Sequence, residues 1–245
     1  MSAVKLKNAP LKEVVFELHW NCDVDNQGAL FDSGFDLAQG KFAEKLESQF
    51  SLHRKLIPDG VPFKIFGAPL HQYWAGEFKW PVVQHGQGMI AVNEVEVGYE
   101  WTIYKKLVLE TVNKLIHSYE DIPSFNKAKL QYIDAWDLED ETPQNFMANN
   151  LQTEIITKYP SPGNLKGFNI QQRFSLKENS VMELNISNAI NNKNQKESVV
   201  WTTTITKNDS LSLDELKSWI DYAHTTASHF FKTMLKPSFY ASLDK

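Results

Sequence analysis

Two carboxylates on separate segments, Glu13 and Asp134, are the acidic side chains of this sequence that could act together as one chemical site. Each lies in a segment whose pattern predicts a strand. Carboxylates on adjacent strands within about 5–8 Å of each other can share a divalent cation, which activates water or polarises a phosphoryl group. The pair therefore raises the hypothesis of a metal-dependent enzyme that acts on a nucleotide or a phosphoester.

Glu13 also has a structural interpretation, because Asn8 and Pro10 stand just before it. Proline fixes φ and favours an extended residue before it, and an asparagine side chain can close a turn onto the backbone. An ionised carboxylate that enters a sheet must be exposed or paired, so we expect a base such as Lys12 or Arg173 to meet Glu13. This interpretation makes the segment a strand entry and is favoured over a catalytic one.

The imidazole of His224 stands at the edge of an apolar helical stripe, four residues after Ile220 and three before Ala227. A histidine in this setting commonly donates a ring proton to a buried carbonyl or carboxylate and fills space. The spacing therefore favours a structural role for His224, with contact to a ligand as the alternative.

No motif in the sequence is complete enough to define an enzyme or a metal site. The segment "GFDLAQGKF" has five residues between its glycines and then Phe42 after the lysine, whereas a phosphate-binding loop needs four and a serine or threonine. "DVDNQG" opens like a calcium loop, but Gly34 stands where a bidentate glutamate is required. Cys22 is the single cysteine, so His19 and Cys22 cannot complete a structural zinc site with a second thiolate. We therefore predict no metal or cofactor and favour a non-enzymatic protein.

Trp74 and Trp80 lie close together in "HQYWAGEFKW" and could offer a platform on which nucleic-acid bases stack. Aromatic residues in hairpins more commonly belong to the sheet core or to a partner surface. The net charge of -5 also gives no overall basic field to attract a phosphate backbone. Nucleic-acid binding through the sheet is therefore kept as an alternative to protein binding.

Periodicity predicts the elements that must position these residues. Apolar and polar residues alternate over 14–20, which predicts a strand at 12–20. Ser212 and Glu215 have the spacing of a capping box and begin a helix over 213–235. The remaining pattern predicts strands at 62–67, 70–76, 78–84, 88–94, 127–137, 167–177, 180–190 and 196–206, and helices at 36–53, 100–119 and 143–158.

This order of elements reads as β-α-β-β-β-α twice, with a break at "EDIPSFN". We therefore predict an α+β fold in which two such halves, residues 1–122 and 123–245, form a mainly antiparallel sheet covered by helices. The chain has 245 residues, of which 42% are hydrophobic, so it can bury one large core or two fused ones. We expect the two halves to form one compact unit.

The composition also predicts a location. A single cysteine cannot form an intramolecular disulfide, and the sequence shows no positively charged segment followed by an apolar one as in a signal peptide. Its longest apolar runs are far short of the roughly 20 residues that a membrane-spanning helix needs. We expect a cytoplasmic protein that does not bind membranes.

The segment "KNAPLKEVVFEL" resembles the N-terminal signature of a sporadically distributed, uncharacterised prokaryotic family of about this length, whose members begin with Asn-Ala-Pro-Ile, a variable residue and Glu. The resemblance continues in "YEWTIYKKL" with Tyr99 and Trp101, in "LQYIDAW" with Tyr132, and in "AHTTASHFFKTML" with His224. It spans the whole chain. The sequence departs from the family at Gln131, where an Arg is usual, and at Asp134, where an Asn is usual.

The patchy distribution of that family implies mobile, conflict-related genes such as those of phage-defence or toxin–antitoxin modules. With no complete catalytic motif, our leading hypothesis is a binding or adaptor protein whose sheet face or inter-half groove receives a protein partner, with a small molecule as a further ligand class. The residues expected to take part in binding are Glu13, Trp74, Trp80, Trp101, Tyr132, Asp134 and His224.

Overall fold

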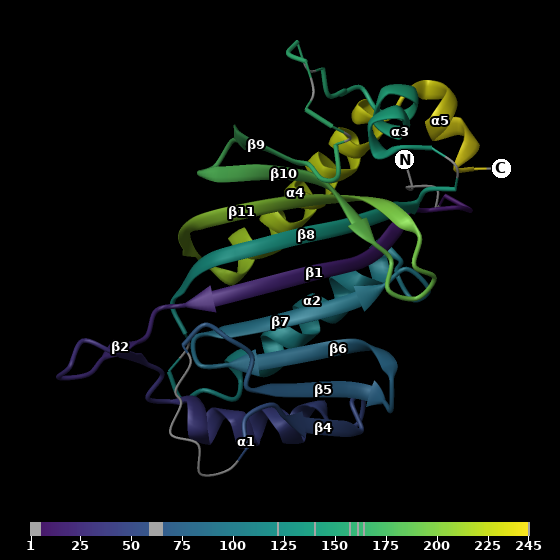
Figure 1. Cartoon of the computed structure of the whole chain (residues 1–245). Coiled ribbons are helices and arrows are strands. Elements are labelled where there is room, and N and C mark those ends of the chain that lie inside the picture. The colour runs from purple at the N-terminus through teal and green to yellow at the C-terminus, as the bar shows by residue number, and fades with distance from the viewer. Residues whose placement is uncertain are drawn as a thin grey trace.

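The computed structural model describes residues 6–58, 66–121, 123–139, 141–156, 158–160, 162–163 and 165–244. Nine strands form one sheet in the order β4-β5-β6-β7-β1-β8-β11-β10-β9, and every neighbouring pair is antiparallel (Figure 1). The predicted α+β class with a mainly antiparallel sheet is thus confirmed. The strands of this sheet are β1 (Leu11–Trp20), β4 (Leu52–Lys55), β5 (His71–Gly76), β6 (Lys79–Gly86), β7 (Met89–Val95), β8 (Phe125–Asp137), β9 (Asn169–Ser175), β10 (Ser180–Ile190) and β11 (Glu197–Leu211).

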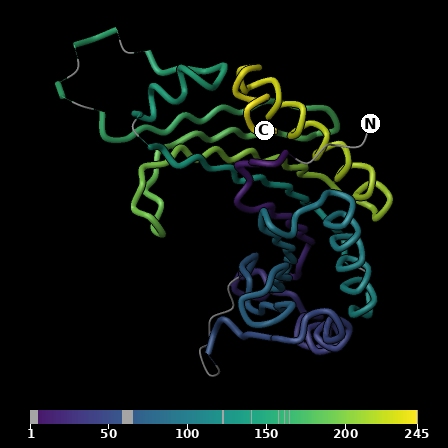
Figure 2. Tube along the Cα trace, turned by 90° about the vertical axis from the view of Figure 1, so that its right-hand side faces the viewer, coloured from purple at the N-terminus to yellow at the C-terminus, as the bar shows by residue number. Residues whose placement is uncertain are grey.

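Helices cover one face of this sheet. The helices are α1 (Phe35–Leu46), α2 (Trp101–Ile116), α3 (Pro143–Asn150), α4 (Leu213–Met234) and α5 (Pro237–Ser242). Figure 2 shows α1, α2 and α4 on the same side of the strands. Val14, Phe16 and Leu18 of β1 point to that side and are fully buried, because alternate residues of a strand face the same way. None of the described helices is long and apolar enough to cross a membrane.

The central pair of strands joins the two halves of the chain. β1 pairs with β7 on one side and with β8 on the other, so that Val14 lies opposite Tyr132. One hydrophobic cluster takes residues from both halves, among them Phe16, Val112, Ile205 and Trp219. A shared sheet and a shared core therefore connect residues on both sides of the break near residue 122.

The first half contains elements that the sequence pattern did not predict. A small two-stranded sheet pairs β2 (Asp23–Val24) with β3 (Leu30–Phe31), and it projects from the body in Figure 1. Helix α1 ends at Leu46, and β4 occupies the end of the segment predicted as helix 36–53. Phe50 continues the apolar spacing of that helix but is buried from an irregular segment, so the expected boundary is wrong.

The second half differs mainly at its helix ends. Helix α3 stops at Asn150, well before the predicted residue 158, after two asparagines that favour turns over helix. Helix α4 ends at Met234, close to the predicted residue 235, and Pro237 opens α5, because proline is well suited to the first turn of a helix. Most of the predicted strand 62–67 lies outside the described residues.

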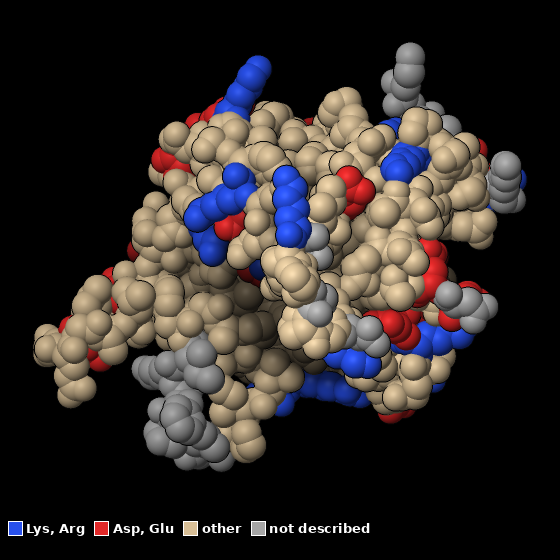
Figure 3. All heavy atoms as spheres, turned by 45° about the horizontal axis from the view of Figure 1, so that its top comes forward, with Lys and Arg blue, Asp and Glu red and all other residues tan. Residues whose placement is uncertain are grey.

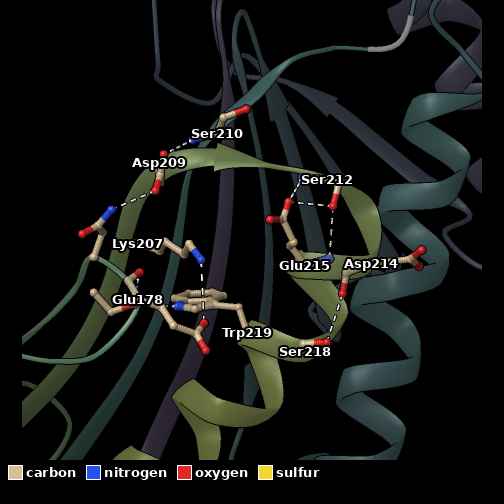
Figure 4. Close-up of polar contacts among 11 residues, drawn as sticks. Glu178, Lys207, Asp209, Ser210, Ser212, Asp214, Glu215, Ser218 and Trp219 are labelled. Carbon is tan, nitrogen blue, oxygen red and sulfur yellow. Dashed lines mark hydrogen bonds and ion pairs between the residues drawn. The ribbon is translucent and has the colours of Figure 1, made fainter.

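The start of α4 is defined by side chains, as the sequence predicted. The Ser212 hydroxyl accepts from the Glu215 backbone N–H at 3.3 Å, and the Glu215 carboxylate accepts from the Ser212 N–H at 2.8 Å (Figure 4). Nearby, Lys207 forms an ion pair with Glu178 beside the indole of Trp219 (Figure 4). The predicted capping box is confirmed, and it fixes where α4 leaves the sheet.

Replacing Ser212 with alanine is expected to lower the free energy of unfolding by about 1 kcal/mol, because the first turn of α4 loses its cap. Urea denaturation followed by circular dichroism would measure the change. Ser218→Ala on the same helix is the control, since its exposed hydroxyl only donates to the Asp214 carbonyl, a bond that adds little. Equal midpoints for the Ser212 variant and the wild type would contradict the capping role.

Candidate functional site

The candidate site is a pocket of about 280 Å³ on the helix-covered side of the sheet, between the two halves of the chain. It is lined by residues 9–11 before and at the start of β1, by residues 99–102 at the start of α2, by β8 and by successive turns of α4. Four of the residues expected from the sequence line it: Trp101, Tyr132, Asp134 and His224. The structure thus brings together side chains that are far apart in the sequence.

The Asn-Ala-Pro segment holds one wall of this pocket in place. The Asn8 N–H donates to the Leu243 carbonyl at 2.9 Å, and the Pro10 carbonyl accepts from the Ala135 N–H at the same distance. Pro10 itself is buried and lines the pocket. The segment therefore leads the chain into β1, as predicted, and also closes the site.

Asp134 is the buried acid of the pocket. It follows Leu130 and Tyr132 in the alternation of β8, which turns its side chain toward the helices. Its side chain is only 6% exposed, and it makes no hydrogen bond to any other residue that the structure describes. Burial raises the pKa of Asp134 to about 7, although Lys12 opposes the rise. Asp134 therefore changes its charge near neutral pH.

Beside Asp134, three aromatic side chains and His224 form one connected group. The rings of Trp101 and His224 stack with centroids 3.8 Å apart. His224 Nδ1 lies 2.8 Å from the Tyr132 hydroxyl, which in turn lies 3.2 Å from the Tyr99 hydroxyl. The predicted carbonyl or carboxylate partner of His224 is thus wrong, because a tyrosine hydroxyl takes that position.

These groups are uncharged at neutral pH. Burial lowers the pKa of His224 to about 4, and burial raises the pKa of Tyr99 and of Tyr132 well above their usual range. The donors in this chain of hydrogen bonds can point either way: the Tyr132 hydroxyl donates to His224 Nδ1 in one tautomer of the imidazole and accepts from it in the other. In the first arrangement His224 Nε2 keeps a hydrogen that it can donate to another group. In the second arrangement the Tyr99 hydroxyl keeps one. Asp134 is therefore flanked by neutral groups whose hydrogen bonds, within the described part of the chain, join them to one another and not to Asp134.

Glu13 does not share a site with Asp134. In β1 it alternates with Val14, which lies opposite Tyr132 on the helix side, so Glu13 and Asp134 point to opposite faces of the sheet. Its carboxylate accepts from Asn93 Nδ2 at 2.6 Å. The expected base partner is wrong, and a metal site that uses both carboxylates is contradicted by this geometry.

The expected partners of Glu13 are engaged elsewhere. Lys12 lies 3.9 Å from Glu96, and Arg173 lies 3.3 Å from Glu183. Among the described residues, no group of three or more His, Cys, Asp or Glu side chains is arranged to hold a metal ion.

Trp74 and Trp80 lie outside the pocket, on the open face of the sheet near its β4 edge. Their rings meet edge to face with centroids 5.3 Å apart, and the Arg54 guanidinium lies 5.9 Å from the ring centre of Trp74. This arrangement leaves no parallel slot for a base between the two indoles. Figure 3 shows Lys and Arg side chains interspersed with Asp and Glu over the face it presents, with no continuous basic patch.

The pocket also includes residues that the sequence pattern did not single out, among them Thr203, Ser228, Lys232 and Tyr240. Ser228 and Lys232 follow His224 by one and two helical turns, so helical spacing from His224 could have identified both. Thr203 lies opposite Tyr132 in β11, and only the strand register shows this.

Comparisons of this chain with protein-family models, with curated proteins and with solved structures found no match.

Proposed function

We propose that this chain is a non-enzymatic binding protein and that its ligand enters the pocket between the two halves. The observation that carries this proposal is Asp134, a carboxylate that is 6% exposed, lines a pocket, and has no hydrogen-bond partner among the described residues. A buried carboxylate without donors costs several kcal/mol unless another molecule supplies them. A bound ligand would supply the missing donors.

Binding is favoured over catalysis by the charge states around the pocket. A general base needs a pKa near the working pH and must lie within hydrogen-bond reach of the proton that it abstracts. His224, with a pKa of about 4, is a weak base, and the tyrosines stay protonated. Of these groups, only Asp134 titrates near neutral pH, and the His224 and tyrosine side chains beside it keep their protonation states there.

The wider role remains the one that the sequence suggested. We propose that ligand binding between the halves serves an adaptor in a phage-defence or toxin–antitoxin module, in keeping with the resemblance in the Asn-Ala-Pro segment. We also propose that the two halves arose by internal duplication. The placement of β1 and β8 side by side at the centre of the sheet, each followed by a run of antiparallel strands and a long helix, supports this origin.

Ser228→Trp tests the pocket, because the indole would fill the space beside His224 on the same face of α4. Native mass spectrometry of the protein purified from its own host should show a bound small molecule in the wild type and its loss in this variant. Thr225→Trp on the exposed side of α4 is the matched control and should keep the ligand. A wild type with nothing bound, or a Ser228 variant that keeps the ligand, would contradict the proposal.

A further inference from the structure

We propose that the ligand of this pocket is an organic ammonium ion, in which a protonated primary or secondary amine is attached to an apolar body. The ammonium group donates hydrogen bonds to Asp134, and the apolar body lies against the aromatic side chains of the walls. The inference rests on the proposed function and names the chemical class that the site recognises.

The charge of the lining points to a cation. Among the described residues that line the pocket, three carry carboxylates, Asp134, Glu96 and Glu100, and one carries an ammonium group, Lys232. Glu100 caps α2 by accepting from the Thr102 N–H at 3.0 Å, so its carboxylate is already engaged. Lys232 is exposed, whereas Asp134 is buried. The buried carboxylate of Asp134, when ionised, repels an anionic ligand and attracts a cation.

The buried carboxylate requires hydrogen-bond donors in addition to charge. An ionised aspartate accepts hydrogen bonds at both oxygens, and charge-assisted bonds of this kind are about twice as strong as neutral ones. Asp134 has no donor among the described residues. A primary ammonium ion provides three donors, whereas a tetraalkylammonium ion provides none and would leave the carboxylate unsatisfied. The recognised cation therefore carries N–H groups.

The walls of the pocket suit the rest of such a molecule. Aromatic side chains come from several elements, with Tyr99 and Trp101 near the start of α2, Tyr132 on β8, Phe231 on α4 and Tyr240 on α5. Aromatic faces attract cations and also cover apolar groups. A volume of about 280 Å³ is enough for a compact amine of one ring or a short chain, and too small for a folded peptide segment.

Protonation of Asp134 should compete with the ammonium ion, because only the ionised carboxylate balances its charge. The other titratable groups that face this part of the pocket are Lys12, Glu96, Tyr99, Glu100, Tyr132, His224, Lys232 and Tyr240. The tyrosines with raised pKa and His224 do not change charge between pH 6 and pH 8. Affinity should therefore rise with pH over that interval as Asp134, with its pKa of about 7, becomes ionised.

Calorimetric titration with matched pairs of probes tests the inference: 2-phenylethylammonium against 2-phenylethanol, and cyclohexylammonium against cyclohexanol. Each pair differs only in the cationic donor group. At pH 8, we expect the wild type to bind at least one ammonium probe at least tenfold more tightly than its alcohol. We also expect the affinity for that probe to fall about tenfold between pH 8 and pH 6, following the ionised fraction of a group with a pKa of about 7.

The deciding variant is Asp134→Asn, which keeps the shape of the side chain and removes its charge. It should lose the preference for the ammonium probe by at least tenfold and lose the pH dependence. Asp137→Asn removes the same charge from the same strand at an exposed position outside the pocket lining, and it should behave as the wild type. The pH profile of the wild type is a second readout that does not depend on the folding of any variant.

Two outcomes separate this inference from the proposed function. If alcohol and ammonium probes bind equally well and Ser228→Trp abolishes both, the pocket is a binding site but the ligand class is wrong. If the wild type binds no probe and also purifies with nothing bound, both proposals fail. An Asp134→Asn protein that retains the ammonium preference would overturn the inference by itself.

Discussion

Replacing Asp32 with alanine is expected to lower the free energy of unfolding by roughly 3–5 kcal/mol, because one carboxylate satisfies several donors at once. Asp32 accepts from the indole N–H of Trp20 at 3.0 Å and from the Tyr119 hydroxyl at 2.6 Å. It also accepts from the backbone N–H of Gly34 at 3.1 Å and of Gly88 at 3.4 Å. Removing it leaves these donors without an acceptor around the buried Trp20.

Chemical denaturation of the purified variant measures this effect, with two variants for comparison. Tyr119→Phe removes one donor and should cost about 1–2 kcal/mol. Asp23→Ala, at an exposed position on β2, should cost less than about 0.5 kcal/mol. Combining the Asp32 and Tyr119 substitutions should cost less than the sum of the two single effects, because both remove the same bond. An Asp32 variant as stable as the Asp23 variant would show that the hydrogen bonds accepted by Asp32 do not stabilise the fold.

Stability is expected to fall steeply as the pH decreases from 6 to 5, because three histidines are held neutral in the folded state. Burial lowers the pKa of His71 to about 4, of His85 to about 3 and of His224 to about 4. The unfolded chain binds protons at these positions near pH 6.5, so folding excludes them below that pH. Asp134 acts in the opposite direction, since its raised pKa lets the folded state hold one extra proton in this interval.

For these four groups taken together, the balance is about two more protons on the unfolded chain, which corresponds to a loss of up to about 2.7 kcal/mol per pH unit. Urea midpoints measured at pH 6.0, 5.5 and 5.0 would give the slope. His85→Leu should roughly halve it, because both ring nitrogens of His85 are buried without a partner among the described residues. The wild type and this variant having the same slope would contradict the assignment of His85 as a buried, neutral histidine.

The parts of the fold that the sequence predicted are those where side-chain pattern and local chemistry agree. β10 has the predicted bounds of 180–190 because Met182, Leu184 and Ile186 alternate with polar residues, and all three are buried. Helix α4 begins where the capping box places it. The end of α1 could not be placed in this way, because Phe50 keeps the helical spacing although tertiary packing holds it in an irregular segment.

The sequence predicted several residues of the candidate site, but it did not predict how they are arranged in space. Tyr132 and Asp134 lie on the face of β8 that points toward the helices, and the apolar residues Ala128 and Leu130 at alternate positions identify that face in the sequence. Glu13 points to the other face of β1 from its neighbour Val14. This places Glu13 on the opposite face of the sheet from Asp134 only once β1 and β8 are known to be neighbours. Contacts between strands that are far apart in the chain depend on register, and one sequence does not specify register.

The central position of β1 also governs the order in which this protein can fold. β1 is made before its partner β8, which begins at Phe125, so one side of the central strand stays unpaired until that later segment has left the ribosome. Pairings across so long a sequence separation close slowly, and an unpaired strand edge invites association with other chains. The nascent chain therefore passes through a stage in which the strand that later lies at the centre of the sheet is an edge strand.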